Sequence, residues 1–363
     1  MSNSSKSKDG SLHQWYRGRL ATGLRHACLL FFMLSPMGLS GCSSSAFEGA
    51  LTRYLSGLAR TFEINANRPT LAVVRAPKAP DPQNQASSSL NLLEFLNTAP
   101  CELHQVISAQ NGTLGKLGNP TTAMIYEIEF LQKAPACIQQ LSRAHPDLAA
   151  QLAAVAQHKQ ADLPDRLRTT LLRSPEWLAF WQPRLHMGDY PAAHQSDLET
   201  AFLALLEQID DMQSLAYSGG TKPLNEALLP LRSGEGGLLL VGWSELLEML
   251  LAGNALITSF LDKRPLCYNG QVNPRAQQFQ SIVLEVFVKQ LQPLIARLNQ
   301  RTYVLWPLID RFESTLEADA DPNYATFVKE RDTRVTLARR ALKDHVALIN
   351  ELFTQCNLQQ GAG

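Results

Sequence analysis

Apolar residues recur every three or four positions through most of the chain after residue 45, a spacing that marks one buried face of an amphipathic helix. In the first half, this pattern predicts helical segments over residues 46–63, 90–96, 101–109, 147–158 and 163–173. One more helix is predicted to start at a cap formed by Thr121 or Thr122 and to run toward Lys133.

The second half of the chain repeats this periodicity over longer stretches. It predicts helical segments over residues 196–215, 238–260, 279–298, 302–316 and 323–355. Pro293 is expected to kink the third of these segments. Leucine and alanine are abundant and runs of β-branched residues are scarce, which favours helix over strand. The predicted fold class is therefore all-α, an irregular multi-helix domain with long helices.

Residues 238–260 form the most hydrophobic of these segments and have the length of a membrane span. Glu245 and Glu248 lie inside it, and each charge near a bilayer centre costs about 2.5–3.5 kcal/mol on insertion scales. We therefore predict a buried bundle helix. The segment 323–355 is predicted to be one long helix whose charged outer face includes Arg331.

Three segments break the helical pattern. Residues 67–89 contain four prolines and a serine triplet, which predicts a crossing loop. Residues 110–120 contain three glycines, two asparagines and a proline, which predicts a second loop. Residues 174–194 are irregular and aromatic, and they form either a connector that packs its own aromatic rings or a ligand groove.

The first 41 residues have the parts of a secretory signal, with a basic start and a short apolar core over residues 27–38. The core ends in Leu39-Ser40-Gly41-Cys42, which matches a bacterial lipobox. We therefore predict a signal peptide over residues 1–41, a lipidated N-terminus over residues 42–45, a single helical domain over residues 46–358 and a disordered tail over residues 359–363. An ordinary signal with an incidental cysteine is the alternative.

Lipidation at Cys42 would hold the protein at a bilayer without a helix that crosses it, because two or more acyl chains give stable anchoring. Ser43 follows the cysteine. By resemblance to bacterial lipoprotein sorting, a non-acidic residue there favours the outer membrane and a domain that faces the periplasm. An aspartate would favour the inner membrane.

Four further cysteines follow Cys42: Cys101, Cys137, Cys267 and Cys356. An even number in an oxidising compartment indicates disulfides, and four cysteines allow three pairings. We favour Cys101–Cys137 and Cys267–Cys356, because each pair lies within one apparent helical substructure. Buried free thiols are the alternative. A zinc site is not expected, because no close CxxC pair occurs.

Charge and motifs limit the function classes. The chain has 33 basic and 33 acidic residues, so no basic excess points to a nucleic-acid partner. HExxH and GxSxG are absent, and the glycine-rich residues 233–237 lack the Gly-Lys-Ser/Thr of a phosphate loop. These glycines predict a turn before a helix. We predict no catalytic residue, metal site or cofactor.

The loop over residues 110–120 is the best candidate binding region. It offers Asn111, Thr113 and Lys116 beside flexible backbone, and functional residues often lie on loops held by a rigid scaffold. Tyr126 and Glu127 follow it and complete the candidate set. An ordinary turn between two helices is the alternative.

Several short motifs resemble a known family. They are Cys101-Glu102-Leu103, Asn111-Gly112-Thr113-Leu114-Gly115-Lys116, Tyr126-Glu127, Phe130-Leu131 and the closing Cys137. This set is similar to an uncharacterised gammaproteobacterial lipoprotein family that is catalogued as a domain of unknown function, number 3080. Gln292-Pro293 in a hydrophobic segment is also similar, so the resemblance covers nearly the whole mature chain. It supports the predicted lipidation and disulfides, and it implies no activity.

Three functions follow from these predictions. The first is an interaction or scaffold protein of the cell envelope, bound to the membrane through Cys42 and to an envelope protein through its domain. The second is a cell-wall enzyme or accessory factor with Glu127 or Glu129 as the acid. The third is a carrier for an apolar ligand in a groove lined by Trp177, Trp181 and Trp243.

Overall fold

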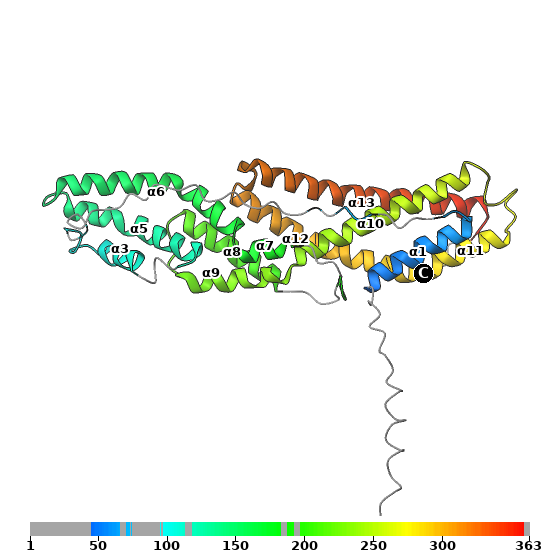
Figure 1. Ribbon diagram of the computed structural model, residues 1–363, viewed down its shortest axis with the longest axis horizontal. Helices are drawn as coiled ribbons and strands as arrows, with labels where there is room; N and C mark the ends of the chain where they lie inside the picture. The colour runs from blue at the N-terminus through cyan, green and yellow to red at the C-terminus, as the bar shows by residue number, and fades with distance from the viewer. Residues whose placement is uncertain are drawn as a thin grey trace, which may run out of the picture. The chain divides into compact units, whose positions relative to one another are not determined.

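Helices account for all of the regular secondary structure in the part of the chain that the structure describes, as the sequence predicts (Figure 1). The structure is a computed structural model. It describes residues 45–65, 70–72, 74, 95, 97–112, 118–182, 187–191 and 197–358. These residues belong to one compact unit, Ser44–Gly363. The predicted signal peptide, Cys42, most of the loop over residues 67–89 and the tail lie outside the described residues.

The α-helices and shorter helical turns follow one another with brief connections. The N-terminal half contains α1 (Ala46–Phe62), α3 (Leu103–Asn111), α5 (Pro120–Leu141), α6 (Pro146–Leu172), α7 (Pro175–Phe180) and α8 (Leu198–Gln213). The C-terminal half contains α9 (Thr221–Leu228), the 3₁₀ helix η1 (Leu229–Ser233), α10 (Glu235–Leu261), α11 (Pro274–Ile282), the π-helix η2 (Val283–Leu291), α12 (Gln292–Thr315), the 3₁₀ helix η3 (Ala318–Ala320) and α13 (Pro322–Gln355).

The hydrophobic helix α10 is a core element. The stretch Thr221–Leu261 is long and apolar enough to cross a membrane by length and composition, yet 67% of its most apolar window is buried. Its neighbour α13 runs beside it (Figure 1), and Arg334 of α13 donates to Glu248 of α10 at 2.9 Å. The prediction of a buried helix over residues 238–260 is thereby confirmed. The carboxylate of Glu248 inside it forms an ion pair with Arg334.

Helix α10 begins at a glycine turn, as predicted for residues 233–237. Gly234 is its N-cap, with a φ of 73° that L side chains rarely adopt. Gly236 lies against the ring of Phe180, and Gly237 lies against the backbone of Gln182. The two residues without side chains therefore allow the end of α7 to pack directly on the first turn of α10.

Asparagine, rather than threonine, caps α5. The side-chain oxygen of Asn119 accepts from the backbone N–H of Thr122 at 2.9 Å and from its hydroxyl at 3.0 Å. Pro120 then occupies the first turn, where its missing N–H costs nothing. The predicted caps Thr121 and Thr122 are therefore wrong, because the helix begins one residue before them.

Several predicted helix breaks are continuous helix. Residues 146–172 form the one helix α6, which includes Pro164, and α5 continues past Lys133 through Pro135 to Leu141. The segments predicted over residues 279–298 and 302–316 form an unbroken run from α11 through η2 to α12. The π-helix precedes Pro293 there, so the wide turn and the proline lie next to each other.

Two disulfides link distant parts of the chain, and both have the predicted pairing. Cys101–Cys137 joins the start of α3 to α5, with the two Cα atoms 5.2 Å apart. Cys267–Cys356 joins the loop after α10 to the end of α13, with the Cα atoms 5.1 Å apart. Each disulfide therefore holds two neighbouring helical elements together.

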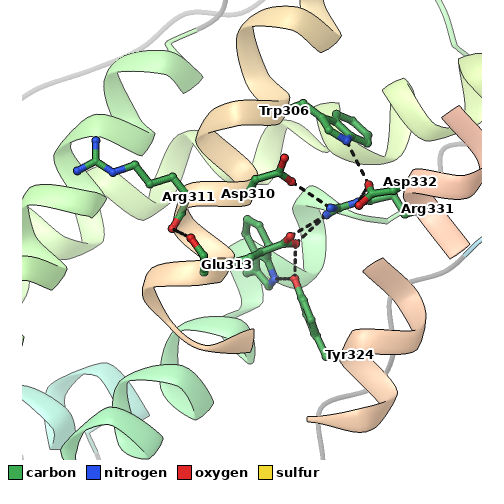
Figure 2. A network of polar contacts seen from close by, with 9 residues as sticks. Trp306, Asp310, Arg311, Glu313, Tyr324, Arg331 and Asp332 are labelled. Atoms are coloured by element: carbon green, nitrogen blue, oxygen red, sulfur yellow. Dashed lines mark hydrogen bonds and ion pairs between the residues drawn. The ribbon is translucent and has the colours of Figure 1, made fainter. Parts of the chain in front are cut away.

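A polar network surrounds the buried Arg331 between α12 and α13, with Glu313 buried and Asp310 and Asp332 partly exposed. Figure 2 shows the guanidinium of Arg331 pointing toward Asp310, Glu313 and Asp332. Its contacts with Glu313 are 2.8 and 3.0 Å, and Tyr324 donates to the same carboxylate at 2.8 Å. Burial alone would lower the pKa of Arg331, but Glu313 and Asp332 raise it. The guanidinium therefore stays charged.

The placement of Arg331 corrects one sequence prediction. Its side chain has 0% exposure, so it does not belong to the outer face of the long C-terminal helix. The guanidinium carbon lies 5.1 Å from the ring centre of Trp181, 5.2 Å from that of Trp306 and 5.7 Å from that of Phe327. Aromatic faces attract a cation, and the carboxylates neutralise its charge, so the protein interior accepts it.

Candidate functional site

The candidate site is a pocket of about 440 Å³ between α3 and α5. Residues 102, 105, 106 and 109 follow the spacing of one helical face at α3. Residues 125, 128, 129, 132 and 133 do the same on α5. The disulfide Cys101–Cys137 fixes the two helices to each other beside these faces.

A turn from much later in the chain forms the third wall. Tyr217, Ser218 and Gly220, between α8 and α9, line the pocket. The side-chain amide of Gln132 donates to the carbonyl oxygens of Leu215 at 3.0 Å and Tyr217 at 2.7 Å. Gln132 therefore ties this turn to α5.

The turn itself is held by a tyrosine. The hydroxyl of Tyr217 donates to the carbonyl oxygen of Gly220 at 2.7 Å. Burial raises the pKa of Tyr217, so the hydroxyl keeps its proton and its role as donor. Gly220 has a φ of 65° and forms the N-cap of α9. The third wall is thereby fixed in shape before any ligand arrives.

The lining combines apolar and polar groups. Its apolar members are Val106, Ala109, Ile125 and Ile128. Its polar side chains, besides Tyr217, are Glu102, Gln105, Glu129, Gln132, Lys133 and Ser218. Apolar side chains in a pocket cover the surface of a ligand and convergent polar groups fix its orientation, so this mixed lining suits an amphipathic ligand.

An ion pair crosses one edge of the pocket. The ammonium of Lys133 lies 2.7 Å from a carboxylate oxygen of Glu102. Its hydrogen bond and its charge lower the pKa of Glu102. Lys133 is thereby committed to a carboxylate on the opposite helix, which leaves Glu129 as the other charged group of the lining.

Glu127 and Glu129 lie in different surroundings. Glu127 is buried and faces α6, where Arg166 donates to it at 3.0 Å and Lys159 lies 3.4 Å away. Two cations therefore hold its carboxylate on the side of α6. Glu129 lines the pocket, and no hydrogen bond or ion pair engages its carboxylate within the described residues. Glu129 is therefore the acid that a ligand can reach.

Of the residues predicted from the sequence for binding, the described ones, Asn111, Tyr126 and Glu127, do not line the pocket. Asn111 is exposed at the end of α3, and Tyr126 is half-buried on α5. Thr113 and Lys116 lie outside the described residues. Sequence reasoning missed the wall from residues 217–220, because Gln132 and Tyr217 are 85 positions apart and no local pattern links them.

Trp177 and Trp181, from the aromatic segment after α6, belong to the core, as does Trp243 of α10. Trp177, Trp181 and Trp243 are each only 1% exposed. The ring centre of Trp177 lies 5.3 Å from that of Phe180 and 4.8 Å from that of Phe312. The structure therefore assigns these residues to packing, and the predicted groove lined by the three tryptophans is wrong.

Metal-binding geometry is also lacking over the residues described. No group of three or more His, Cys, Asp or Glu side chains is arranged to hold a metal ion there.

Comparison with known protein families identifies the family of this chain. The family described as Protein of unknown function (DUF3080) matches residues 51–360 of the chain, which include the pocket and both disulfides. No curated protein and no solved structure matches the chain.

Proposed function

The chain belongs to the family described as Protein of unknown function (DUF3080), and on this premise we propose that it is a lipid-anchored interaction protein of the bacterial cell envelope. Its membrane attachment is the lipid on Cys42, and its domain faces the periplasm from the outer membrane. Its domain holds a protein partner at the pocket between α3 and α5. It acts as a scaffold rather than as an enzyme.

The sequence before the domain supports the anchor. Leu39-Ser40-Gly41-Cys42 matches a lipobox, and Ser43 is the residue type that favours the outer membrane. The first described residue, Ser45, already caps α1 through a capping box with Glu48. The folded domain thus begins three residues after Cys42, which leaves a short tether.

The pocket is the single observation that carries the interaction function. It lies on a surface that the disulfide and Gln132 hold rigid, and its lining is only partly apolar. A preformed surface binds with a smaller loss of conformational entropy than a flexible one. This favours the recognition of a partner at this face.

The alternative of a cell-wall enzyme has weaker support. Glycoside hydrolysis generally needs two carboxyl groups with separate roles across the bond to be cleaved. Among the described lining residues, the carboxylates are Glu102, which pairs with Lys133, and Glu129. With Glu127 engaged by Arg166 and Lys159, a second uncommitted acid is not available at this face.

Photo-crosslinking in living cells tests the proposal. A photoreactive amino acid in place of Gln105, which is exposed at the pocket, should give a discrete protein adduct. The same probe in place of Lys343, exposed on α13, is the matched control and should give none. Failure of the Gln105 probe in correctly folded, lipidated protein would refute a partner at this pocket.

The anchor is tested in the same cells. The variant Cys42→Ala removes the thiol that would carry the lipid, so the protein should leave the membrane fraction and the adduct should decrease. Mass spectrometry of the unaltered protein should find acyl chains on Cys42. A Cys42→Ala protein that stays in the membrane fraction would contradict the lipid anchor.

A further inference from the structure

The pocket has an apolar interior and a polar rim. Val106 and Ile125 keep 5% and 4% of their surface exposed and form the accessible inner surface, with the fully buried Ile128 behind them. Glu102 and Gln105 are exposed, and Glu129 is partly exposed. A ligand that enters therefore meets hydrocarbon with its inner part and polar groups with its outer part.

The charge of the lining is unbalanced. It contains the two carboxylates of Glu102 and Glu129 and the one ammonium of Lys133. Lys133 lies 2.7 Å from Glu102, so this pair cancels. The carboxylate of Glu129 remains, without a hydrogen bond or ion pair among the described residues. The pocket therefore carries one net negative charge.

We propose that the pocket receives a lysine or arginine side chain of the partner protein, with the aliphatic stem on Val106 and Ile125 and the cationic head at Glu129. This assignment rests on the proposed function and names what the partner must present. Lysine and arginine commonly bury their stems on apolar surface while the charged head stays at a wet rim. Gln105 and Ser218 offer oxygen atoms to the remaining N–H groups of the head.

Other classes of ligand fit less well. A phosphate or carboxylate would face Glu129 with a like charge, while Lys133 is already paired. A purely apolar ligand would cover Glu129 and leave a desolvated carboxylate without a partner, which is costly. A cation on an aliphatic stem satisfies both the interior and the rim of the pocket.

Simple probes test the charge and the stem separately. The purified full chain in detergent micelles is titrated with n-butylguanidinium, n-butylammonium and n-butanol, and saturation-transfer difference NMR measures each dissociation constant. Both cations should bind more tightly than butanol. Glu129→Gln should weaken the cations about three- to fivefold, as for a partly exposed ion pair, and leave butanol unchanged. Glu129→Lys should weaken them about tenfold or more.

The matched control is Glu351→Gln, which removes an exposed carboxylate on α13 and should leave all three constants unchanged. Equal binding of butanol and the cations, or cation binding that Glu129→Gln does not change, would overturn the assignment. The two proposals fail separately. An adduct from Gln105 without any cation preference would keep the interaction function and remove the basic side chain as its occupant.

Discussion

At the residue scale, the side chain of His345 lies in a buried network of hydrogen bonds. Its Nε2 atom is 2.7 Å from the hydroxyl of Tyr54, and its Nδ1 atom is 2.5 Å from the side-chain oxygen of Asn254. The amide nitrogen of Asn254 donates to the carbonyl of Ala341. Burial raises the pKa of Tyr54, so that hydroxyl keeps its proton and donates to Nε2. The neutral imidazole therefore donates from Nδ1, and the network is satisfied without any charge.

This network predicts a loss of stability in acid. Burial lowers the pKa of His345 to about 4, whereas a histidine in the unfolded chain titrates near 6.5. The unfolded state therefore binds the proton more readily. This difference in pKa contributes about 3 kcal/mol to the free energy of unfolding. The contribution is complete above pH 6.5 and is lost as the pH falls toward 4. Urea unfolding at pH 7.5 and pH 4 measures the difference.

The variant His345→Gln provides the control for that measurement. Glutamine can bond to both Tyr54 and Asn254 but does not titrate, so its loss of stability between the two pH values should be smaller by about 3 kcal/mol. An identical pH dependence in the variant and the natural protein would show that His345 is not the titrating group.

The sequence patterns predicted the helices better than they predicted where charged side chains lie. The periodicity assigned Arg331 to an outer face, although the side chain is fully buried. Its partners Asp310 and Glu313 lie on α12, and its aromatic neighbours come from α7, α12 and α13. The surroundings that stabilise this buried charge come from three separate parts of the chain. The local spacing of residues around Arg331 therefore cannot predict its burial.

At the element scale, three prolines lie inside continuous helices. Pro135, Pro164 and Pro307 lie inside α5, α6 and α12, and all three are exposed. A proline removes one backbone hydrogen bond, and on an exposed face water can satisfy the carbonyl that loses its partner. The hydrophobic pattern predicted that these regions are helical. It ended one helix near Lys133, whereas α5 continues through the exposed Pro135 to Leu141.

The close packing of α7 on α10 gives a prediction for two glycines of the same helix. A Cβ at Gly237 would overlap the backbone of Gln182, which cannot move without displacing the end of α7. Gly237→Ala should therefore destabilise the protein by about 1–3 kcal/mol. A Cβ at Gly253 would lie 3.4 Å from its nearest neighbours, which is ordinary contact. Thermal unfolding followed by circular dichroism compares the two variants.

Gly253→Ala is the matched control, because alanine favours a helix by about 1 kcal/mol over glycine. Its stability should stay within about 1 kcal/mol of the natural protein or rise. Equal stability of both variants would mean that α7 does not rest on the first turn of α10.

At the scale of the whole molecule, the disulfides close loops of different length. The cysteines are 36 positions apart in Cys101–Cys137 and 89 positions apart in Cys267–Cys356. Chain entropy gives upper limits of about 4 and 5 kcal/mol for these loops. Replacing either pair by alanine should therefore lower the free energy of unfolding by about 2–4 kcal/mol in urea titrations.

Only one of these pairs borders the pocket. Loss of Cys101–Cys137 should also decrease crosslinking from Gln105, because that disulfide holds α3 against α5. Loss of Cys267–Cys356 should leave the adduct unchanged at a temperature where both variants are folded. An equal decrease in both variants would mean that overall stability, and not the pocket, controls the adduct.

The fold class could be predicted because helical periodicity is a local pattern in the sequence. Both disulfides could be predicted because four cysteines allow only three pairings. The two pocket faces at α3 and α5 also follow helical spacing, so a search for polar positions on each face would have found them. The turn at residues 217–220 is different. It reaches the pocket through the bonds of Gln132, and such a contact exists only after the chain has folded.

The positions of the tryptophans determine which structural changes intrinsic fluorescence can detect in this protein. Trp177, Trp181 and Trp243 are buried, and Trp306 is partly buried beside Arg331. No tryptophan is among the described residues that line the pocket. Intrinsic tryptophan fluorescence therefore reports unfolding around α7, α10, α12 and α13. It changes little when a ligand binds at α3 and α5. A change in emission on adding a ligand would be a sign of global rearrangement, and occupancy of the pocket needs a reporter placed there.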